Sequence, residues 1–258
     1  MHAVELEFEY SPEDFFEFEF SCEVDEGILT IDQGIVKFKF IGSESVASPA
    51  LEAKIVELAR REFLARQLLN HRQFEFGGCT FTSIDDDGNR KNHGFHSVDE
   101  KLSFREKMDF VIEDRDGNII RDSKNERKEK EERFLNLVRE ASLKDRAVGE
   151  LMEFYHSSVL DPRNEFHHLY QIRELLRERL GKDLGILKAL GISKDKLSQF
   201  GNITNEYPVE QGRHQGKFSD LLREATQEEL SEIREISKEL IERFATYVIE
   251  QENDIQSQ

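Results

Sequence analysis

The sequence predicts an α+β protein, with an antiparallel β-rich N-terminal domain over residues 1–125 and an all-α bundle over residues 126–258. Apolar residues recur with a period of two in the first half and with helical spacing in the second. Between the halves, residues 121–132 are charged and almost devoid of apolar side chains. We therefore expect a domain boundary near residue 125.

Length and charge narrow the classes of function. The 258 residues suffice for two domains with real cores. No apolar run reaches the ~20 residues of a membrane span, and the N-terminus lacks signal-peptide features, so we expect a cytoplasmic protein without a membrane partner. The formal charge of −18 argues against nonspecific nucleic-acid binding by the whole chain, but it is compatible with a small cationic site. Cys22 and Cys79 are too few for a thiolate metal cage, and we expect neither metal nor cofactor.

Three stretches near the N-terminus alternate between apolar and polar residues. They cover residues 4–10, 16–22 and 36–40. This period of two predicts strands with one buried and one wet face. The first two stretches carry glutamates on the wet face, whereas the third carries Lys37 and Lys39. Opposite charges across neighbouring strands should therefore help to set their pairing.

A helix and further strands should follow. Residues 48–70 begin with Ser-Pro, a helix start, and continue with an apolar stripe at helical spacing. Strand patterns resume at residues 73–84, 107–113 and 119–121. Two Asp-Gly-Asn turns, at 87–89 and 116–118, lack the glycine and closing glutamate of a calcium loop. They are typical of hairpins.

The second half reads as amphipathic helices. Apolar stripes cover residues 134–141 and 148–155, with a bend expected near Gly149. A helix opens at Asp161-Pro162, and the last one opens at residues 226–229 with a capping box. Such helices bury their apolar faces only by packing on one another, so we expect a bundle.

One polar loop of this half carries residues suited to phosphate chemistry. Arg213 and Lys217 are cations that hold phosphate, and His214 titrates near neutrality. Asn202 and Asn205 supply amides just before them. We take Arg213 and His214 as the first catalytic candidates, with Asn202, Asn205 and Lys217 as ligand-binding residues. Capping of helices or pairing with surface carboxylates would explain the same residues without a function.

Several short runs carry a resemblance to known proteins: Leu169-Tyr170-Gln171-Ile172-Arg173, Ala189-Leu190-Gly191-Ile192-Ser193, Gly201-Asn202, Asn205-Glu206 and Gly212-Arg213-His214-Gln215-Gly216-Lys217. They resemble a widespread group of uncharacterised bacterial proteins, whose C-terminal helical segment is similar to HEPN domains. These are four-helix bundles that include metal-independent RNases and nucleotide-binding or nucleotidyl-transfer modules, many in toxin or antiviral systems. From Phe134 onward, the resemblance implies a HEPN-like bundle with RNA, a nucleotide or a protein as partner. It also implies a homodimer in the RNase branch.

The resemblance implies a further catalytic arrangement. RNases of this family carry an Arg, then a polar residue, with a His five to seven positions after the Arg. Arg213 and His214 do not fit this spacing, whereas Arg163-Asn164 followed by His168 does. The spacing alone also fits two other pairs, Arg66 with His71 and Arg90 with His96, and we rank Arg163 and His168 ahead of them because of Asn164. In the family's reaction a ribose 2′-hydroxyl attacks the adjacent phosphate, His acts as base and Arg stabilises the charge. An interaction or sensing protein is our first hypothesis, and a metal-independent endoribonuclease is the alternative.

A third hypothesis is a DNA-binding regulator. Residues 187–198 read as a helix-turn-helix, with Gly191 between the helices and Ser193 capping the second. Lys188, Lys194 and Lys196 would then face phosphate. The acidity of the chain argues against this hypothesis, and short helix-turn-helix pieces are common in bundles.

Overall fold

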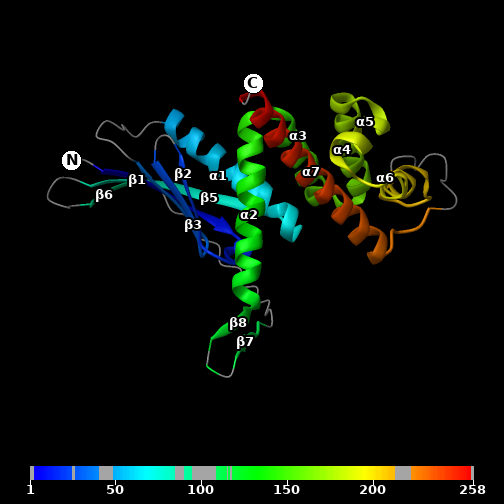
Figure 1. Ribbon diagram of the computed structural model, residues 1–258. Coiled ribbons are helices and arrows are strands. Elements are labelled where there is room, and N and C mark those ends of the chain that lie inside the picture. The colour runs from blue at the N-terminus through cyan, green and yellow to red at the C-terminus, as the bar shows by residue number, and fades with distance from the viewer. Residues whose placement is uncertain are drawn as a thin grey trace. The chain divides into compact units, whose positions relative to one another are not determined.

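The computed structural model describes residues 3–24, 27–40, 49–84, 90–94, 109–114, 116, 118–212 and 222–256. An antiparallel sheet in the N-terminal region is followed by a helical C-terminal region, as the sequence predicts (Figure 1). The chain forms two compact units. The first comprises Met1–Arg66 and Phe74–Arg133, and the second comprises Gln67–Gln73 and Phe134–Gln258. The helical unit therefore includes a short segment from the N-terminal half.

The first unit is built on a six-stranded antiparallel sheet with strand order β2-β3-β4-β1-β5-β6. The predicted alternation is confirmed in the first strand, where Leu6 and Phe8 are buried and Glu7 is exposed. Lys37 lies opposite Glu7 in the register, with 3.5 Å between Nζ and Oε2, which confirms the predicted cross-strand charge pairing. The strands are β1 (Ala3–Ser11), β2 (Phe20–Val24), β3 (Gly27–Asp32), β4 (Ile35–Phe40), β5 (Glu75–Ile84) and β6 (Arg90–Gly94). Two further strands, β7 (Val111–Glu113) and β8 (Ile119–Asp122), pair as a separate two-stranded sheet.

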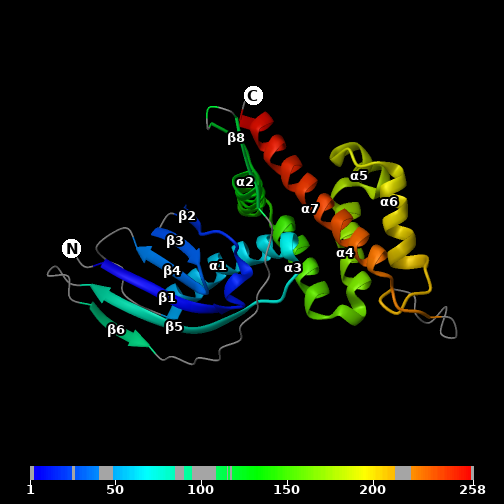
Figure 2. The same cartoon turned by 90° about the horizontal axis from the view of Figure 1, so that it is seen from below.

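The strand predicted over residues 16–22 begins only at Phe20. A 3₁₀ turn, η1 (Glu13–Phe15), precedes it. Phe15 and Phe16 are both buried, and both rings contact Phe63, with centroids 5.2 Å and 4.9 Å away. Successive side chains of a strand point to opposite faces, so this shared contact requires a turn. Phe63 belongs to α1 (Pro49–Asn70), the predicted helix, which lies across one face of the sheet (Figure 2).

The charged stretch predicted as a boundary lies mostly inside a helix, α2 (Ser123–Lys144). The side chain of Asp122 accepts hydrogen bonds from two amides of its first turn, at 3.0 Å and 3.1 Å. Glu131, farther along α2, pairs with the buried Arg66 of α1. Arg66 also donates to the carbonyl oxygen of Phe15 at 3.2 Å. The charged side chains of this stretch therefore cap the helix and form ion pairs. Apolar periodicity carries no information about such interactions.

The second unit is a helical assembly whose core is made by α3, α4 and α7. The break before α3 lies at Asp145, which caps the helix by accepting from the amide of Ala147 at 2.9 Å, and not at Gly149. The predicted capping box is confirmed, since Thr226 and Glu229 exchange hydrogen bonds of 2.8 Å and 3.2 Å. The elements are α3 (Arg146–Leu160), η2 (Pro162–Asn164), α4 (Glu165–Leu180), α5 (Lys182–Leu190), α6 (Lys194–Gly201), the π-helical η3 (Asn202–Glu206) and α7 (Gln227–Gln256).

A pair of glycine substitutions tests the packing of this unit. A Cβ on Gly201 would overlap the guanidinium of Arg173, which is held by Asp183 at 2.8 Å. Gly201→Ala should therefore destabilise the protein by about 1–3 kcal/mol, measured by chemical denaturation. Gly149→Ala meets no atom within 4 Å and should stabilise it by about 0.5–1 kcal/mol. An equal effect of the two substitutions would contradict this packing, and an Arg173→Met background should relieve the Gly201 penalty.

Candidate functional site

The first predicted site falls partly outside the described residues. Arg213, His214 and Lys217 belong to residues 213–221, which the structure does not describe. The residues that flank this range on both sides are described, and backbone interactions bring the two flanking segments together. Val209 and Arg223 form an isolated parallel bridge. The amide of Glu210 donates to the carbonyl of Arg223 at 2.9 Å, which brings the two ends together.

Asn202 and Asn205 lie in the π-helical turn η3 at the end of α6. Asn202 is exposed, and its carbonyl accepts from the amide of Tyr207 at 2.9 Å. Asn205 is half-buried and donates from Nδ2 to the carboxylate of Glu206 at 2.6 Å. Thr204 is fully buried. Single π-helical turns occur often at functional sites, so this turn stays a candidate, with one amide available to solvent.

The second predicted site is brought together at the junction of α3 and α4. Asp161 accepts a hydrogen bond from Nδ2 of Asn164 at 2.8 Å and lies 3.5 Å from Nε2 of His168. The hydrogen bond from Asn164, followed by the interaction with His168, holds the pKa of Asp161 below its usual value. Arg163 is exposed on η2 and has no hydrogen-bond or ion-pair partner among the described residues. A cation, an amide and an imidazole therefore meet solvent within one short stretch.

Directly behind this surface lies a buried polar network that the sequence did not reveal. Glu165, the first residue of α4, is only 1% exposed. Its two carboxylate oxygens accept from Nε and Nη2 of Arg234 on α7, at 2.6 Å and 2.8 Å. Such a bidentate pair compensates much of the cost of burying the carboxylate. In sequence Glu165 looks like an ordinary acidic residue of a first helical turn, and no local signal indicates its burial.

His71 joins the same network. Its Nε2 lies 3.5 Å from Glu165, and its Nδ1 lies 3.1 Å from the hydroxyl of Tyr155. Burial raises the pKa of Tyr155, so the hydroxyl stays protonated and donates a hydrogen bond to Nδ1 of a neutral His71. Burial, with Arg234 nearby, lowers the pKa of His71 to about 4. The carboxylate of Glu165 does not reverse this shift because Arg234 already neutralises it.

Two further hydrogen bonds hold the segment Gln67–Gln73 in the helical unit. The buried amide oxygen of Gln67 lies 2.9 Å from Nδ1 of His156, and Nε2 of Gln73 donates to the carbonyl of Val159 at 3.1 Å. His71 itself has a positive φ of 48°, which is uncommon for a residue other than glycine. The network therefore includes a residue with an unusual backbone conformation at the end of α1.

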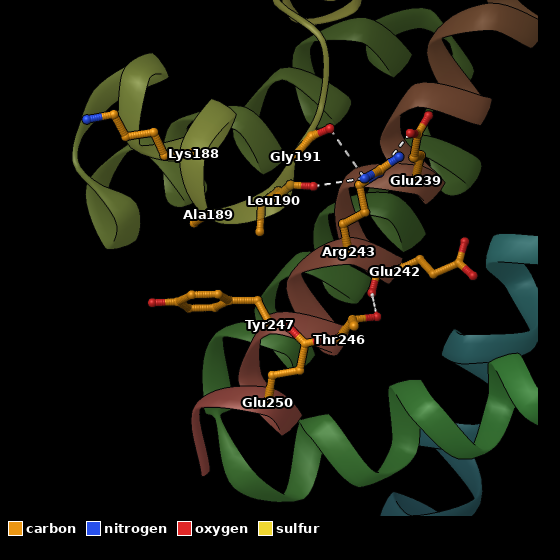
Figure 3. Close-up of a pocket in the computed structure, with 10 residues that line it drawn as sticks. All are labelled: Lys188, Ala189, Leu190, Gly191, Glu239, Glu242, Arg243, Thr246, Tyr247 and Glu250. Atoms are coloured by element: carbon orange, nitrogen blue, oxygen red, sulfur yellow. Dashed lines mark hydrogen bonds and ion pairs between the residues drawn. The ribbon is translucent and has the colours of Figure 1, made fainter. Parts of the chain in front are cut away.

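Hydrogen bonds and an ion pair connect residues 187–198, the segment predicted as a helix-turn-helix, to α7. Arg243 donates from Nη1 to the carbonyls of Leu190 and Gly191, at 2.9 Å and 3.5 Å, and from Nε to Glu239 at 2.8 Å (Figure 3). Lys196 also pairs with Glu239, at 2.6 Å. The adjoining pocket has a volume of about 700 Å³. It is lined by Lys188, Ala189, Leu190, Gly191, Glu239, Glu242, Arg243, Thr246, Tyr247 and Glu250. Three carboxylates beside two cations make this pocket a poor match for phosphate.

Comparison of the chain with protein-family models, with curated proteins and with solved structures found no match. Within the described ranges, no group of three or more His, Cys, Asp or Glu side chains is arranged to hold a metal ion. No helix among these residues combines the length and apolar character needed to cross a membrane.

The half-buried His71 predicts how the free energy of unfolding depends on pH. The pKa of His71 falls from 6.5 to about 4 on folding, so the unfolded chain binds a proton more readily between these values. Its contribution to stability is complete above pH 6.5 and is lost as pH falls toward 4, up to about 3 kcal/mol. His71→Gln should flatten this part of the profile of unfolding free energy against pH, measured by urea denaturation. Parallel profiles for the variant and the wild type would contradict the shift.

Proposed function

We propose that the helical unit binds RNA or a nucleotide through the surface formed by Arg163, Asn164 and His168. The protein would then act as a phosphate-sensing or RNA-binding protein. One observation carries the proposal: Asp161 contacts both Asn164 and His168, and the exposed Arg163 lies next to them in the chain. The resemblance of this half to HEPN domains supports the same class of ligand and a role in antiviral defence or a toxin system.

The chemistry of this surface suits a phosphodiester. The guanidinium of Arg163 is the strong, permanent cation that phosphate recognition uses. The surface lies at the start of α4, where the helix dipole favours negative charge. The overall charge of −18 restricts such binding to a local cationic patch. We therefore expect a modest affinity that falls as the salt concentration rises.

Endoribonuclease activity at the same surface is the second candidate, favoured by the pairing of Asp161 with His168. An aspartate that holds one imidazole nitrogen leaves the other free to accept a proton. In the proposed step Nδ1 of His168 takes the proton of a ribose 2′-hydroxyl, and the 2′-oxygen attacks phosphorus. The bond to the 5′-oxygen breaks, that oxygen takes a proton from solvent, and Arg163 stabilises the phosphate charge.

Binding is tested with a fluorescently labelled single-stranded RNA in the presence of a chelator, followed by anisotropy across a salt series. Arg163→Ala should weaken binding several-fold and reduce the slope of log K against log salt by about 0.7, the effect of one lost phosphate contact. Arg146→Ala removes an arginine that is 91% exposed on the same unit and should leave affinity unchanged.

The same titration separates the two predicted sites. Loss of binding with His214→Ala or Lys217→Ala, but not with Arg163→Ala, would assign the ligand to the loop at residues 213–221 instead. Absence of binding to RNA and to mononucleotides at low salt would reject the proposal.

Cleavage is tested by incubating the same RNA with the full chain in chelator and analysing the products. If His168 acts as the base, His168→Ala and Asp161→Asn should lower the rate constant by about 10²-fold or more, while the products retain a 2′,3′-cyclic phosphate. Equal rates for the wild type and both variants would remove the nuclease hypothesis and leave the binding hypothesis intact.

A further inference from the structure

A pocket lies on the seam between α3 and α4, next to the proposed binding surface. Its volume is about 560 Å³, within the ~300–1,000 Å³ that is typical of ligand sites. Phe154 of α3 and Leu175 of α4, both half-buried, form its apolar part. Gln171 and Glu178 of α4 add an amide and a carboxylate. An aromatic ring and an apolar side chain with a few polar groups beside them suit a flat ligand with a polar edge.

The pocket continues the proposed binding surface along α4. Residues three and four apart share one face of a helix, and Asn164, His168, Gln171, Leu175 and Glu178 follow one another at these intervals. With a rise of about 1.5 Å per residue, Gln171 lies about 5 Å beyond His168 along the helix axis, and Leu175 about 10 Å beyond it. A ligand bound at His168 can therefore extend into the pocket along the same face of the helix.

Phe154 reaches this face from the neighbouring helix. α3 and α4 pack against each other and are joined by the short turn η2, so they form an antiparallel pair (Figure 2). Phe154 lies seven residues before Asp161, and Gln171 lies seven residues after Asn164. This symmetry about the turn brings Phe154 and Gln171 opposite each other, and both line the pocket. The ring of Phe154 therefore lies about one helical turn from His168 along the seam.

The pocket itself carries no net formal charge. Two cations and two carboxylates line it: Arg177, Lys182, Glu174 and Glu178. Arg177 already pairs with Glu174 at 2.8 Å and lies 3.4 Å from Asp183. A phosphate would therefore find no cluster of cations in the pocket. An uncharged part of a ligand fits it better, while the exposed Arg163 outside the pocket remains for a phosphate.

The polar groups of the pocket suit the edge of a nucleobase. The side chain of Glu178 is exposed and has no partner among the described residues. A carboxylate accepts hydrogen bonds only, and in nucleic acids it pairs with the exocyclic amino group of a base. Adenine, cytosine and guanine carry such a group, whereas uracil does not. The amide of Gln171, which lies 3.5 Å from Nε2 of His167, can donate as well as accept.

We propose that this pocket binds one base of a single-stranded RNA, stacked on Phe154 with its amino group toward Glu178, while a neighbouring phosphate lies at Arg163. The inference rests on the proposed function, because it extends the same ligand from the binding surface along α4. Single-stranded RNA fits this arrangement, since its unpaired bases can turn outward and stack on aromatic side chains. A mononucleotide can make only part of these contacts, so a short oligonucleotide should bind more tightly.

A fluorescence experiment reports on the pocket directly. The chain has no tryptophan, so Phe154→Trp places a single indole ring there. A short oligoadenylate added to this full-length variant in chelator should quench its emission, because a base stacks on the ring. The corresponding oligouridylate should require at least about fivefold higher concentration, since it lacks the amino group. Tyr247→Trp is the matched control, because it puts the indole in the pocket between α5 and α7, and its emission should not change.

Affinity measured by anisotropy with labelled oligoadenylate tests the stacking. Phe154→Leu keeps an apolar side chain but removes the ring, so it should weaken binding by at least about fivefold with unchanged circular dichroism. Phe154→Tyr retains a ring and should bind more tightly than Phe154→Leu. Glu178→Gln should reduce the preference for oligoadenylate over oligouridylate, because the amide donates to uracil oxygens as well as accepting from adenine.

The outcomes separate this inference from the proposed function. If Phe154→Leu binds like the wild type while Arg163→Ala still weakens binding, the base does not occupy the pocket and the proposed function stands. Equal quenching of Phe154→Trp and Tyr247→Trp would likewise reject the pocket. Equal affinity of the wild type for oligoadenylate and oligouridylate would overturn the role of Glu178. A wild-type chain that binds neither oligonucleotide at low salt would overturn both proposals.

Discussion

The helical unit depends on the burial of one carboxylate. Glu165 starts α4 with 1% of its surface exposed, and it is compensated by the two-point contact with Arg234 of α7 and by His71 beside it. Removing one partner of a buried pair of this kind generally costs about 3–5 kcal/mol, because the remaining charge stays desolvated. The contact therefore imposes a strict requirement on how α4 and α7 pack, since a small shift of either helix would separate a charge from its partner.

The same carboxylate links this packing to the candidate site. Asn164 precedes Glu165 directly, and His168 lies one helical turn further along α4. Residues of the buried network thus fix the first turn of the helix that carries the surface residues. A binding site gains affinity when its groups are held in position before the ligand arrives. Glu165, which lies between Asn164 and His168 in the sequence, holds the surface formed by Arg163, Asn164 and His168 in position in this way.

Several carboxylates of this acidic chain lie directly beside a cation. Glu7 lies beside Lys37 in the sheet, Glu131 pairs with Arg66, and Glu239 is shared between Lys196 and Arg243. Cations therefore tend to form ion pairs within the fold. An exposed arginine without a partner among the described residues, such as Arg163, is for this reason more informative than its charge alone.

Local sequence determined the elements whose signals are short in range. Alternation placed β1 and β4, the Ser-Pro start placed α1, and the Thr226–Glu229 capping box placed the start of α7, because each signal reports contacts within a few residues. The start of β2 and the helix through residues 121–132 were missed. They depend on Phe63, Arg66 and Glu17, which are distant in sequence from the residues that they hold.

The residues of the candidate site, Arg163, Asn164 and His168, were selected from their spacing in the sequence. Only the tertiary structure shows that Asp161 contacts two of them, Asn164 and His168. Spacing also pointed to Arg213 and His214, which lie outside the described residues. The network of Glu165, Arg234, His71 and Tyr155 was decided by tertiary structure alone, since its members come from four separate segments. Burial and charge compensation are properties of packed helices, and no periodicity within a single helix encodes which residue of another helix will meet it.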